Sequence, residues 1–137
     1  MQRRLAAEPK DHSIEPRARQ AVACCEQRYS PAPMRIRPGT RADLAAMMAI
    51  YNRVVVTSAA TFDLEPLDRE QQEAWIARFD GGEHPLLVAE DESGVIGFAY
   101  YVGFRGKPGY SRTKETTVYV AERARRSGVA KALYEGL

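Results

Sequence analysis

Two apolar runs joined by a four-residue turn constrain the fold of this chain more than any other feature. The first run is "PLLVAE", residues 85–90, and the second is "VIGFAYYVGF", residues 95–104, with "DESG" between them. Runs of this length that are rich in β-branched and aromatic residues predict strands, and so short a connection joins strands that run antiparallel. We therefore expect an antiparallel sheet.

Helical signals precede this hairpin. After a short predicted strand over residues 34–37, Thr40 is expected to cap a helix, with Asp43 in the capping-box position. Asp68 is expected to cap a second helix that ends at the glycine pair 81–82. The apolar stripe of the first helix consists of Leu44, Met47, Met48, Tyr51, Val54 and Val55, and the apolar face of the second of Trp75, Ile76 and Phe79.

A third β-rich run, "ETTVYV" at residues 115–120, leads into an apolar helix that starts near Gly128. The predicted order is therefore β-α-α-β-β-β-α. This order describes an α+β domain over residues 34–137, with a mainly antiparallel sheet flanked by helices.

Composition narrows the class of protein. The 137 residues carry a net charge of +2, with 45% hydrophobic and 28% charged residues, which fits one domain and argues against a nucleic-acid partner. Adjacent Cys24 and Cys25 form neither a disulfide framework nor a metal-ligand spacing, so we expect a cytoplasmic protein without a metal. No apolar run suggests a membrane span. Residues 1–33, with four prolines, are expected to be a disordered extension, unless translation starts at Met34.

The start of the last helix is a candidate anion site. A helix N-terminus leaves amides unpaired and carries partial positive charge, which suits a phosphate or pyrophosphate. Arg125 and Arg126 add charge, Ser127 adds a donor, and Gly128 lets a ligand approach the backbone. Neither the P-loop nor the dinucleotide-binding fingerprint matches here. An ordinary charged loop is the alternative interpretation.

The segment "RRSGVA", residues 125–130, resembles a signature of the GCN5-related N-acetyltransferases (GNAT): arginine or glutamine, two residues, glycine, one residue, then glycine or alanine. Three longer blocks are similar, in order and spacing, to the phosphinothricin acetyltransferase branch: "IYNRVVVTSAATFDLEP", "LLVAEDESGVIGFAYYVGFR" and "YSRTKETTVYVAERARRSGVAKAL". The resemblance covers residues 34–137 and implies the acyl-CoA N-acyltransferase (GNAT) fold, of which the chain would hold the N-terminal half to two-thirds.

The resemblance also implies site residues and a cosubstrate, acetyl-CoA. Val118, Tyr119 and Val120 would pair with its pantetheine arm. Its pyrophosphate would be held by Arg125, Arg126, Ser127, Gly128, Val129 and Ala130. The Val120 amide would donate to the thioester carbonyl, where a donor stabilises developing charge. Glu115 would be the general base for the acceptor amine, directly or through water; the alternative is a strand-end glutamate that faces water.

The acceptor pocket implied by the resemblance lies in two loops. Its residues would be Phe62, Glu65, Phe104, Arg105, Tyr110, Arg112 and Thr113. A guanidinium at Arg105 or Arg112 suits a substrate carboxylate because it binds one bidentately, whereas the aromatic residues have core packing as an alternative role.

Three functions follow from these patterns. The first is acetyl-CoA-dependent acetylation of the primary amine of a small, phosphinothricin-like amino acid. The second is a truncated, catalytically inactive module that binds coenzyme A weakly or a protein partner, since the closing elements of the fold are expected to be missing. The third is acetylation of a protein N-terminus or lysine. Similarity to the small-molecule branch favours the first, and a homodimer is left open.

Overall fold

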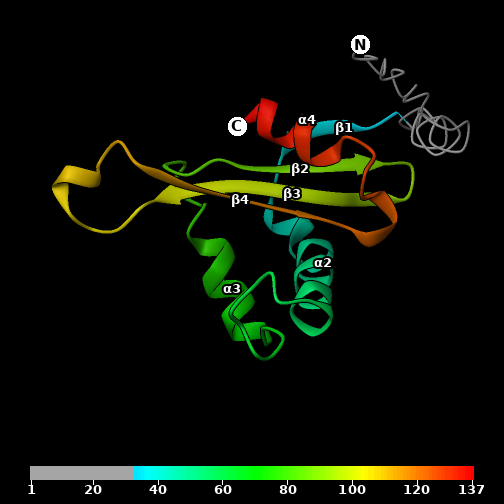
Figure 1. Ribbon diagram of the computed structural model, residues 1–137, viewed down its shortest axis with the longest axis horizontal. Helices are drawn as coiled ribbons and strands as arrows, with labels where there is room; N and C mark the ends of the chain where they lie inside the picture. The colour runs from blue at the N-terminus through cyan, green and yellow to red at the C-terminus, as the bar shows by residue number, and fades with distance from the viewer. Residues whose placement is uncertain (1–32) are drawn as a thin grey trace, which may run out of the picture.

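Within the described part of the chain, four strands form one antiparallel sheet in the order β1-β2-β3-β4, so neighbours in sequence are also neighbours in space (Figure 1). The computed structural model describes residues 33–137, so the predicted extension lies, except for Pro33, outside the described residues. The strands are β1 (Arg35–Pro38), β2 (Leu86–Asp91), β3 (Gly94–Gly103) and β4 (Lys114–Val120). The predicted antiparallel hairpin is confirmed, because β2 pairs with β3 across the turn.

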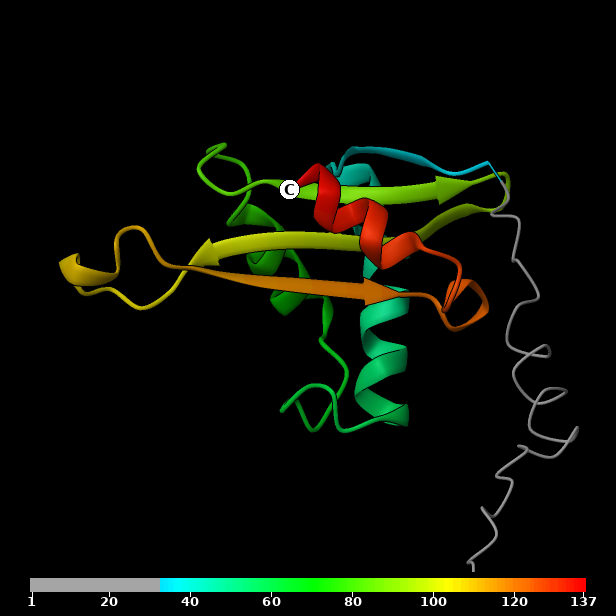
Figure 2. The same ribbon diagram turned by 45° about the horizontal axis from the view of Figure 1, so that its top comes forward.

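Helices cover both faces of this sheet. Helices α2 (Leu44–Thr57) and α3 (Arg69–Ala77) lie on one face, and α4 (Val129–Gly136) crosses the other (Figures 1 and 2). The predicted element order and the α+β class are therefore confirmed. Helix α3 ends before the glycine pair, because Phe79 already lies in a tighter turn in which its amide donates to the Ile76 carbonyl at 3.0 Å. Within the described residues, no helix has the length and apolarity needed to cross a membrane.

The predicted capping residues both lie at helix starts, although Thr40 opens a short 3-10 turn, Arg41–Asp43, that leads into α2. The Asp43 carboxylate accepts from the Thr40 amide at 2.9 Å and from Arg37 at 2.8 Å, which ties the end of β1 to the start of α2. The Arg37 guanidinium lowers the pKa of Asp43 to about 2 by hydrogen bonding. Asp68 accepts from the Gln71 amide at 2.9 Å at the start of α3.

The core has one cluster on each face of the sheet. The cluster under α2 and α3 contains Met47, Met48, Ile50, Ile76, Leu86, Val88 and Phe98. The cluster under α4 contains Ala89, Ile96, Ala99, Ala124, Val129 and Leu133. Helix α4 lies close to the sheet at Gly97, where an added Cβ would lie 3.0 Å from a Val129 methyl group. The absence of a side chain at Gly97 therefore allows α4 to pack this close to β3.

Candidate functional site

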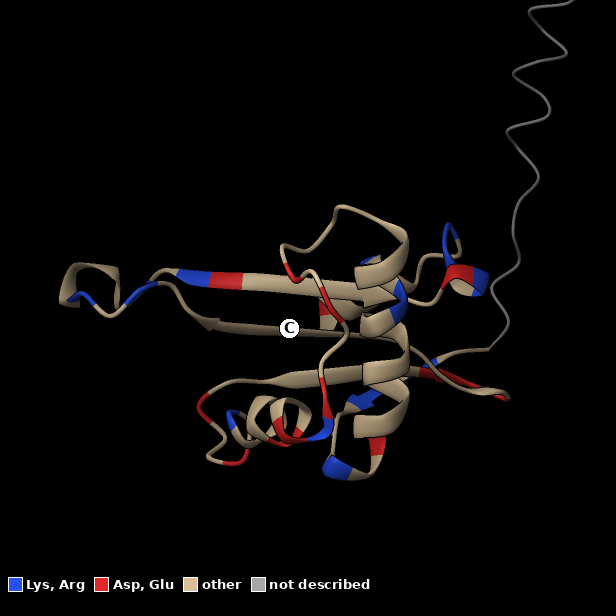
Figure 3. Cartoon of the chain, turned by 90° about the horizontal axis from the view of Figure 1, so that it is seen from below, with Lys and Arg blue, Asp and Glu red and all other residues tan. Residues whose placement is uncertain are grey.

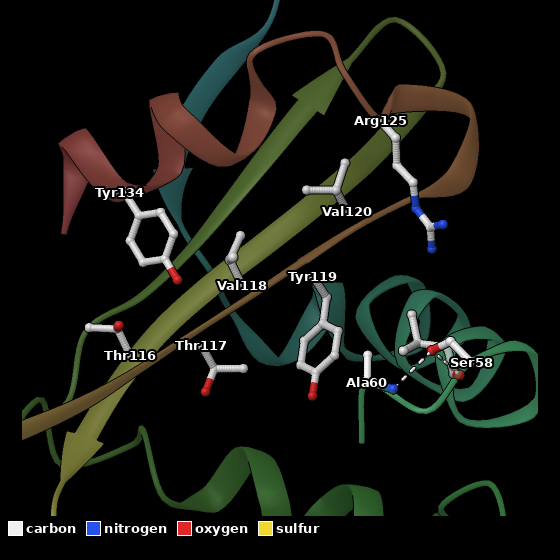
Figure 4. A pocket seen from close by; sticks show the side chains of 10 residues that line it. Ser58, Ala60, Thr116, Thr117, Val118, Tyr119, Val120, Arg125 and Tyr134 are labelled. Carbon is white, nitrogen blue, oxygen red and sulfur yellow. Dashed lines mark hydrogen bonds between the residues drawn. The ribbon is translucent and has the colours of Figure 1, made fainter. Parts of the chain in front are cut away.

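A cleft of about 480 Å³ follows the outer edge of β4 (Figure 4). One wall is the strand itself, the second is the end of α2 with the loop after it, and the third is formed by α4 and the turn before it. The lining residues are Val54, Ser58, Ala60, Thr116, Thr117, Val118, Tyr119, Val120, Arg125 and Tyr134. Four residues predicted to bind the cosubstrate, Val118, Tyr119, Val120 and Arg125, thus meet in one cleft.

The strand register decides which main-chain groups of β4 face this cleft. The Ala121 amide donates to the Ile96 carbonyl at 2.8 Å, so pairing to β3 falls on the odd-numbered residues of β4. The amides of Val118 and Val120 consequently point to the outer edge, where no other strand pairs among the described residues. The Tyr119 main chain is directed to β3 instead, so its contribution to the cleft is its side chain.

The side chains of β4 alternate between the two faces, as period two predicts. Val118 and Val120 pack on the α4 side, whereas Tyr119 packs on the α2 side. The Tyr119 ring meets the Tyr51 ring edge-on at 5.1 Å, and burial raises the pKa of Tyr119 to about 12. The Tyr51 hydroxyl donates to Asp63, which anchors the loop after α2 beside the cleft.

The turn between β4 and α4 has the backbone form of a helix start that is open to a ligand. Gly128 is the N-cap of α4, with φ +85°, and no side chain of the described residues caps the helix. Within the described part of the chain, Arg123 pairs with Asp91 at 3.1 Å, but no ion pair involves Arg125 or Arg126. Two unpaired cations therefore stand beside uncapped amides, as an anion site requires.

Two other residues predicted for this turn face inward. The Ser127 hydroxyl donates to the Ala124 carbonyl at 2.6 Å, and the residue is only 7% exposed. Val129 is 2% exposed and belongs to the core under α4. These side chains shape the turn from within, so only their main-chain groups are available to a ligand.

Glu115 lies outside the cleft, at the opposite end of β4 from the turn. Its side chain is exposed, on the same face of the strand as Thr117. Val120 is five positions further along the chain, which is about 17 Å along a strand. Glu115 is thus close to the connection between β3 and β4 and remote from the anion end.

This connection, residues 104–113, projects from the body of the molecule (Figure 2). Phe104 and Tyr110 pack edge-to-face inside it at 5.5 Å, and the Arg105 guanidinium lies 5.1 Å from the Phe104 ring centre. Arg105, Lys107, Arg112 and Lys114 make this end of β4 basic, and no acidic residue lies among them (Figure 3). The aromatic pair stabilises the connection, which presents its cations to solvent.

The remaining predicted acceptor residues lie elsewhere. Phe62 is 102% exposed, and Glu65 is also exposed, in the loop after α2. No hydrogen bond or ring contact among the described residues joins them to the basic connection. Of the two predicted parts of the acceptor pocket, the β3–β4 connection is the one next to Glu115.

Sequence reasoning missed six residues that line the cleft: Val54, Ser58, Ala60, Thr116, Thr117 and Tyr134. The apolar pattern of α2 assigns Val54 to the core, and its side chain is 5% exposed, but it also lines the cleft. Ser58 and Ala60 belong to a run of small residues directly after α2. Small side chains there leave room beside β4, and this run is the local signal of the cleft wall in the sequence.

The chain belongs to the GNAT acetyltransferase family, since the family model described as "Acetyltransferase (GNAT) domain" matches residues 36–137. Among its relatives is a phosphinothricin N-acetyltransferase of Streptomyces coelicolor, 36% identical over 109 residues that cover 77% of this chain and 64% of the relative. The L-methionine sulfoximine/L-methionine sulfone acetyltransferase of Pseudomonas aeruginosa is 35% identical over 103 residues, covering 74% of this chain and 60% of the relative.

Solved structures agree with this assignment. A phosphinothricin acetyltransferase from Sinorhizobium meliloti, in complex with acetyl-CoA, superposes with a TM-score of 0.71 at 32% identity, covering 76% of this chain and 57% of that one. A putative acetyltransferase from Salmonella typhimurium, with its cofactor acetyl-CoA, has the same TM-score of 0.71 and covers 76% of this chain and 60% of that one. The GNAT fold is confirmed, and the chain spans 57–64% of the length of these four proteins.

Proposed function

We propose that residues 34–137 form the acetyl-CoA-binding and catalytic part of an N-acetyltransferase that acetylates the primary amine of a small amino acid. The observation that carries this proposal is the order of groups along β4: cations and uncapped amides at one end, edge amides in the middle, and a carboxylate beside a basic connection at the other end. A pyrophosphate, an amide-containing arm, a thioester and an amino acid would meet complementary groups in that order. A cytoplasmic location and a homodimer remain predictions from the sequence.

The anion end is suited to the pyrophosphate of acetyl-CoA. Arg125 lines the cleft next to the uncapped start of α4, and Arg126 follows it. The arm would then run along the outer edge of β4, where the amides of Val120 and Val118 point outward and are suited to pair with the amide groups of the arm.

The distance along β4 favours Val118 over Val120 as the donor to the thioester carbonyl. Glu115 and Val120 are about 17 Å apart along the strand, which is too far for both to act on one reacting centre. Val118 is about 10 Å from Glu115, a gap that a glutamate side chain and one bridging water span. We therefore propose Val118 as the thioester donor and Val120 as a contact to the arm.

In the reaction, the acceptor amine attacks the thioester carbon and forms the new C–N bond. Glu115 takes the proton that the amine loses, directly or through water, and the Val118 amide stabilises the negative charge that develops on the carbonyl oxygen. The C–S bond then breaks, and coenzyme A leaves as a thiolate that acquires a proton. Binding both reactants along one strand supplies the proximity that this attack needs.

The acceptor is proposed to be an amino acid because its carboxylate would meet the basic connection. Arg112 is three residues from Glu115, so a carboxylate bound at Arg112 leaves an α-amino group within reach of the base. The relatives named for phosphinothricin and methionine sulfone supply the compounds to try first.

The test compares Glu115→Gln with a matched control, Glu92→Gln, which changes an exposed glutamate in the turn between β2 and β3. Each protein is mixed with acetyl-CoA and either phosphinothricin or L-methionine sulfone, and the release of free thiol is followed. Loss of a general base is expected to lower the turnover of Glu115→Gln by about 100-fold or more, whereas the control retains it. Coenzyme A affinity, measured by titration calorimetry, should be the same in all three proteins.

Full turnover in Glu115→Gln would remove Glu115 from the proposed mechanism. Binding of coenzyme A by the wild-type chain without any thiol release would instead favour the non-catalytic binding module.

A further inference from the structure

Tyr134 is the one cleft-lining residue supplied by α4, and its side chain is partly exposed. Its neighbour Leu133 is fully buried and anchors the helix on the sheet, whereas Tyr134 is 46% exposed. Figure 4 shows its hydroxyl pointing into the cleft, toward the edge of β4 at Thr116 and Val118. Among residues 33–137, this hydroxyl has no hydrogen-bond partner.

The direction of α4 explains how Tyr134 reaches this place. After the turn, α4 runs back across the sheet, opposite to the direction of β4 (Figure 2). Tyr134 follows Gly128 by six residues, so it lies about 9 Å from the helix start along the axis. A ligand anchored by its pyrophosphate at Gly128 and extended along β4 would therefore pass beneath the Tyr134 ring.

We propose that Tyr134 is a cosubstrate-binding residue whose phenol covers the extended arm of coenzyme A and whose hydroxyl hydrogen-bonds that arm near its thioester end. The inference rests on the proposed function, which places the arm in this cleft. It adds a side-chain contact to a site that otherwise holds the arm by main-chain amides. It also gives α4 a second role, in addition to binding the pyrophosphate at its N-terminus.

A packing role does not account for this arrangement. Val129 and Leu133 already fix α4 on the sheet, at 2% and 0% exposure. The Tyr134 ring is half exposed and faces the space between α4 and the edge of β4, so removing its hydroxyl leaves the core intact. The hydroxyl is the polar group that α4 presents to the middle of the cleft.

The test measures binding instead of turnover. The affinity of wild type, Tyr134→Phe and a control, Tyr101→Phe, is determined by titration calorimetry for coenzyme A and for ADP. ADP carries the pyrophosphate and lacks the arm. Tyr101 is a matched control because it lies on β3 with Lys114 over its ring and outside the cleft lining. Loss of one hydrogen bond is expected to weaken coenzyme A binding by Tyr134→Phe roughly three- to tenfold, with ADP binding unchanged.

Each outcome bears on the inference. Equal coenzyme A affinity in wild type and Tyr134→Phe overturns it, and so does an equal loss for ADP, which would place the effect at the turn. A similar loss in Tyr101→Phe also overturns it. If the wild-type chain binds no coenzyme A, the proposed function fails together with the inference, whereas binding by wild type with no effect of Tyr134→Phe refutes the role of Tyr134 alone.

Discussion

Replacing Gly97 by alanine tests whether the close packing of α4 on the sheet determines the position of the residues that line the cleft. An added Cβ at Gly97 would lie 3.0 Å from the Tyr119 carbonyl oxygen, 3.0 Å from a Val129 methyl group and 3.4 Å from a Leu133 methyl group. The two contacts at 3.0 Å are tighter than ordinary van der Waals distances, and one of them is to a backbone oxygen. Strand β4 or helix α4 must therefore move by a few tenths of an ångström.

The magnitude follows from two opposing effects. Overpacking a well-packed core costs about 1–3 kcal/mol, whereas replacing glycine by alanine within a strand recovers about 0.5 kcal/mol of chain entropy. The free energy of unfolding should thus fall by about 0.5–2.5 kcal/mol. Gly103→Ala is a matched control in the same strand, since a Cβ at Gly103 has no atom within 4 Å. The control should be neutral or slightly stabilising.

Urea unfolding followed by circular dichroism measures the difference between the two variants. Coenzyme A titration of the folded proteins then shows whether the displacement reaches the cleft, because a shift of α4 moves both Gly128 and Tyr134. If Gly97→Ala is as stable as Gly103→Ala, the close approach of α4 does not limit the packing. If Gly97→Ala is less stable but binds coenzyme A normally, the close packing of α4 on the sheet does not determine the position of the site.

Three further predictions concern the turn, a cation beside it and the ion pair at the start of α2. Gly128→Ala should lower the free energy of unfolding by about 1–2 kcal/mol in urea, because φ +85° disfavours any side chain; Gly106→Ala, without this constraint, should not. Arg125→Ala should weaken the binding of coenzyme A and of ADP equally in titration calorimetry, and it should reduce the salt dependence of both affinities. A loss of affinity for coenzyme A alone would contradict the placement of Arg125 at the pyrophosphate. The pKa of Asp43 is about 2 in the folded protein, compared with 3.8 for an unperturbed aspartate. Its ion pair with Arg37 therefore stabilises the fold by roughly 2 kcal/mol above about pH 4, and this stabilisation is lost as the pH falls from about 4 to about 2. Urea unfolding of Asp43→Asn should lack this acid-dependent step, and an unchanged pH profile would refute the assignment.

Local signals allowed most of the fold to be predicted from sequence. Asp68 and Gln71 are three residues apart, so the cap of α3 needs no tertiary contact, and the short turn at Gly94 fixes the pairing of β2 with β3. The sequence predicts too late an end for α3, because the ring of Phe79 continues the apolar pattern after its backbone has left the helix.

The cleft was harder to predict because it is made by tertiary packing. Sequence shows that Ser127 can donate a hydrogen bond but not that its hydroxyl turns inward to Ala124. It shows Tyr134 as one aromatic residue of an amphipathic helix, and only the crossing of α4 over the sheet brings that ring to the edge of β4. The order of groups along β4, by contrast, follows directly from the sequence.

The outward direction of the Val118 and Val120 amides depends on the register in which β4 pairs with β3. Because main-chain groups alternate along a strand, inserting or deleting one residue between Gly103 and Lys114 and shifting the register by one would turn the amides of Val118 and Val120 toward β3 and that of Tyr119 outward. The same slip would move Glu115 to the other face. A register shift of two residues would preserve both arrangements, and a change in loop length that leaves the register in place would affect neither, so the pairing of β4 with β3 is what fixes the direction of these amides.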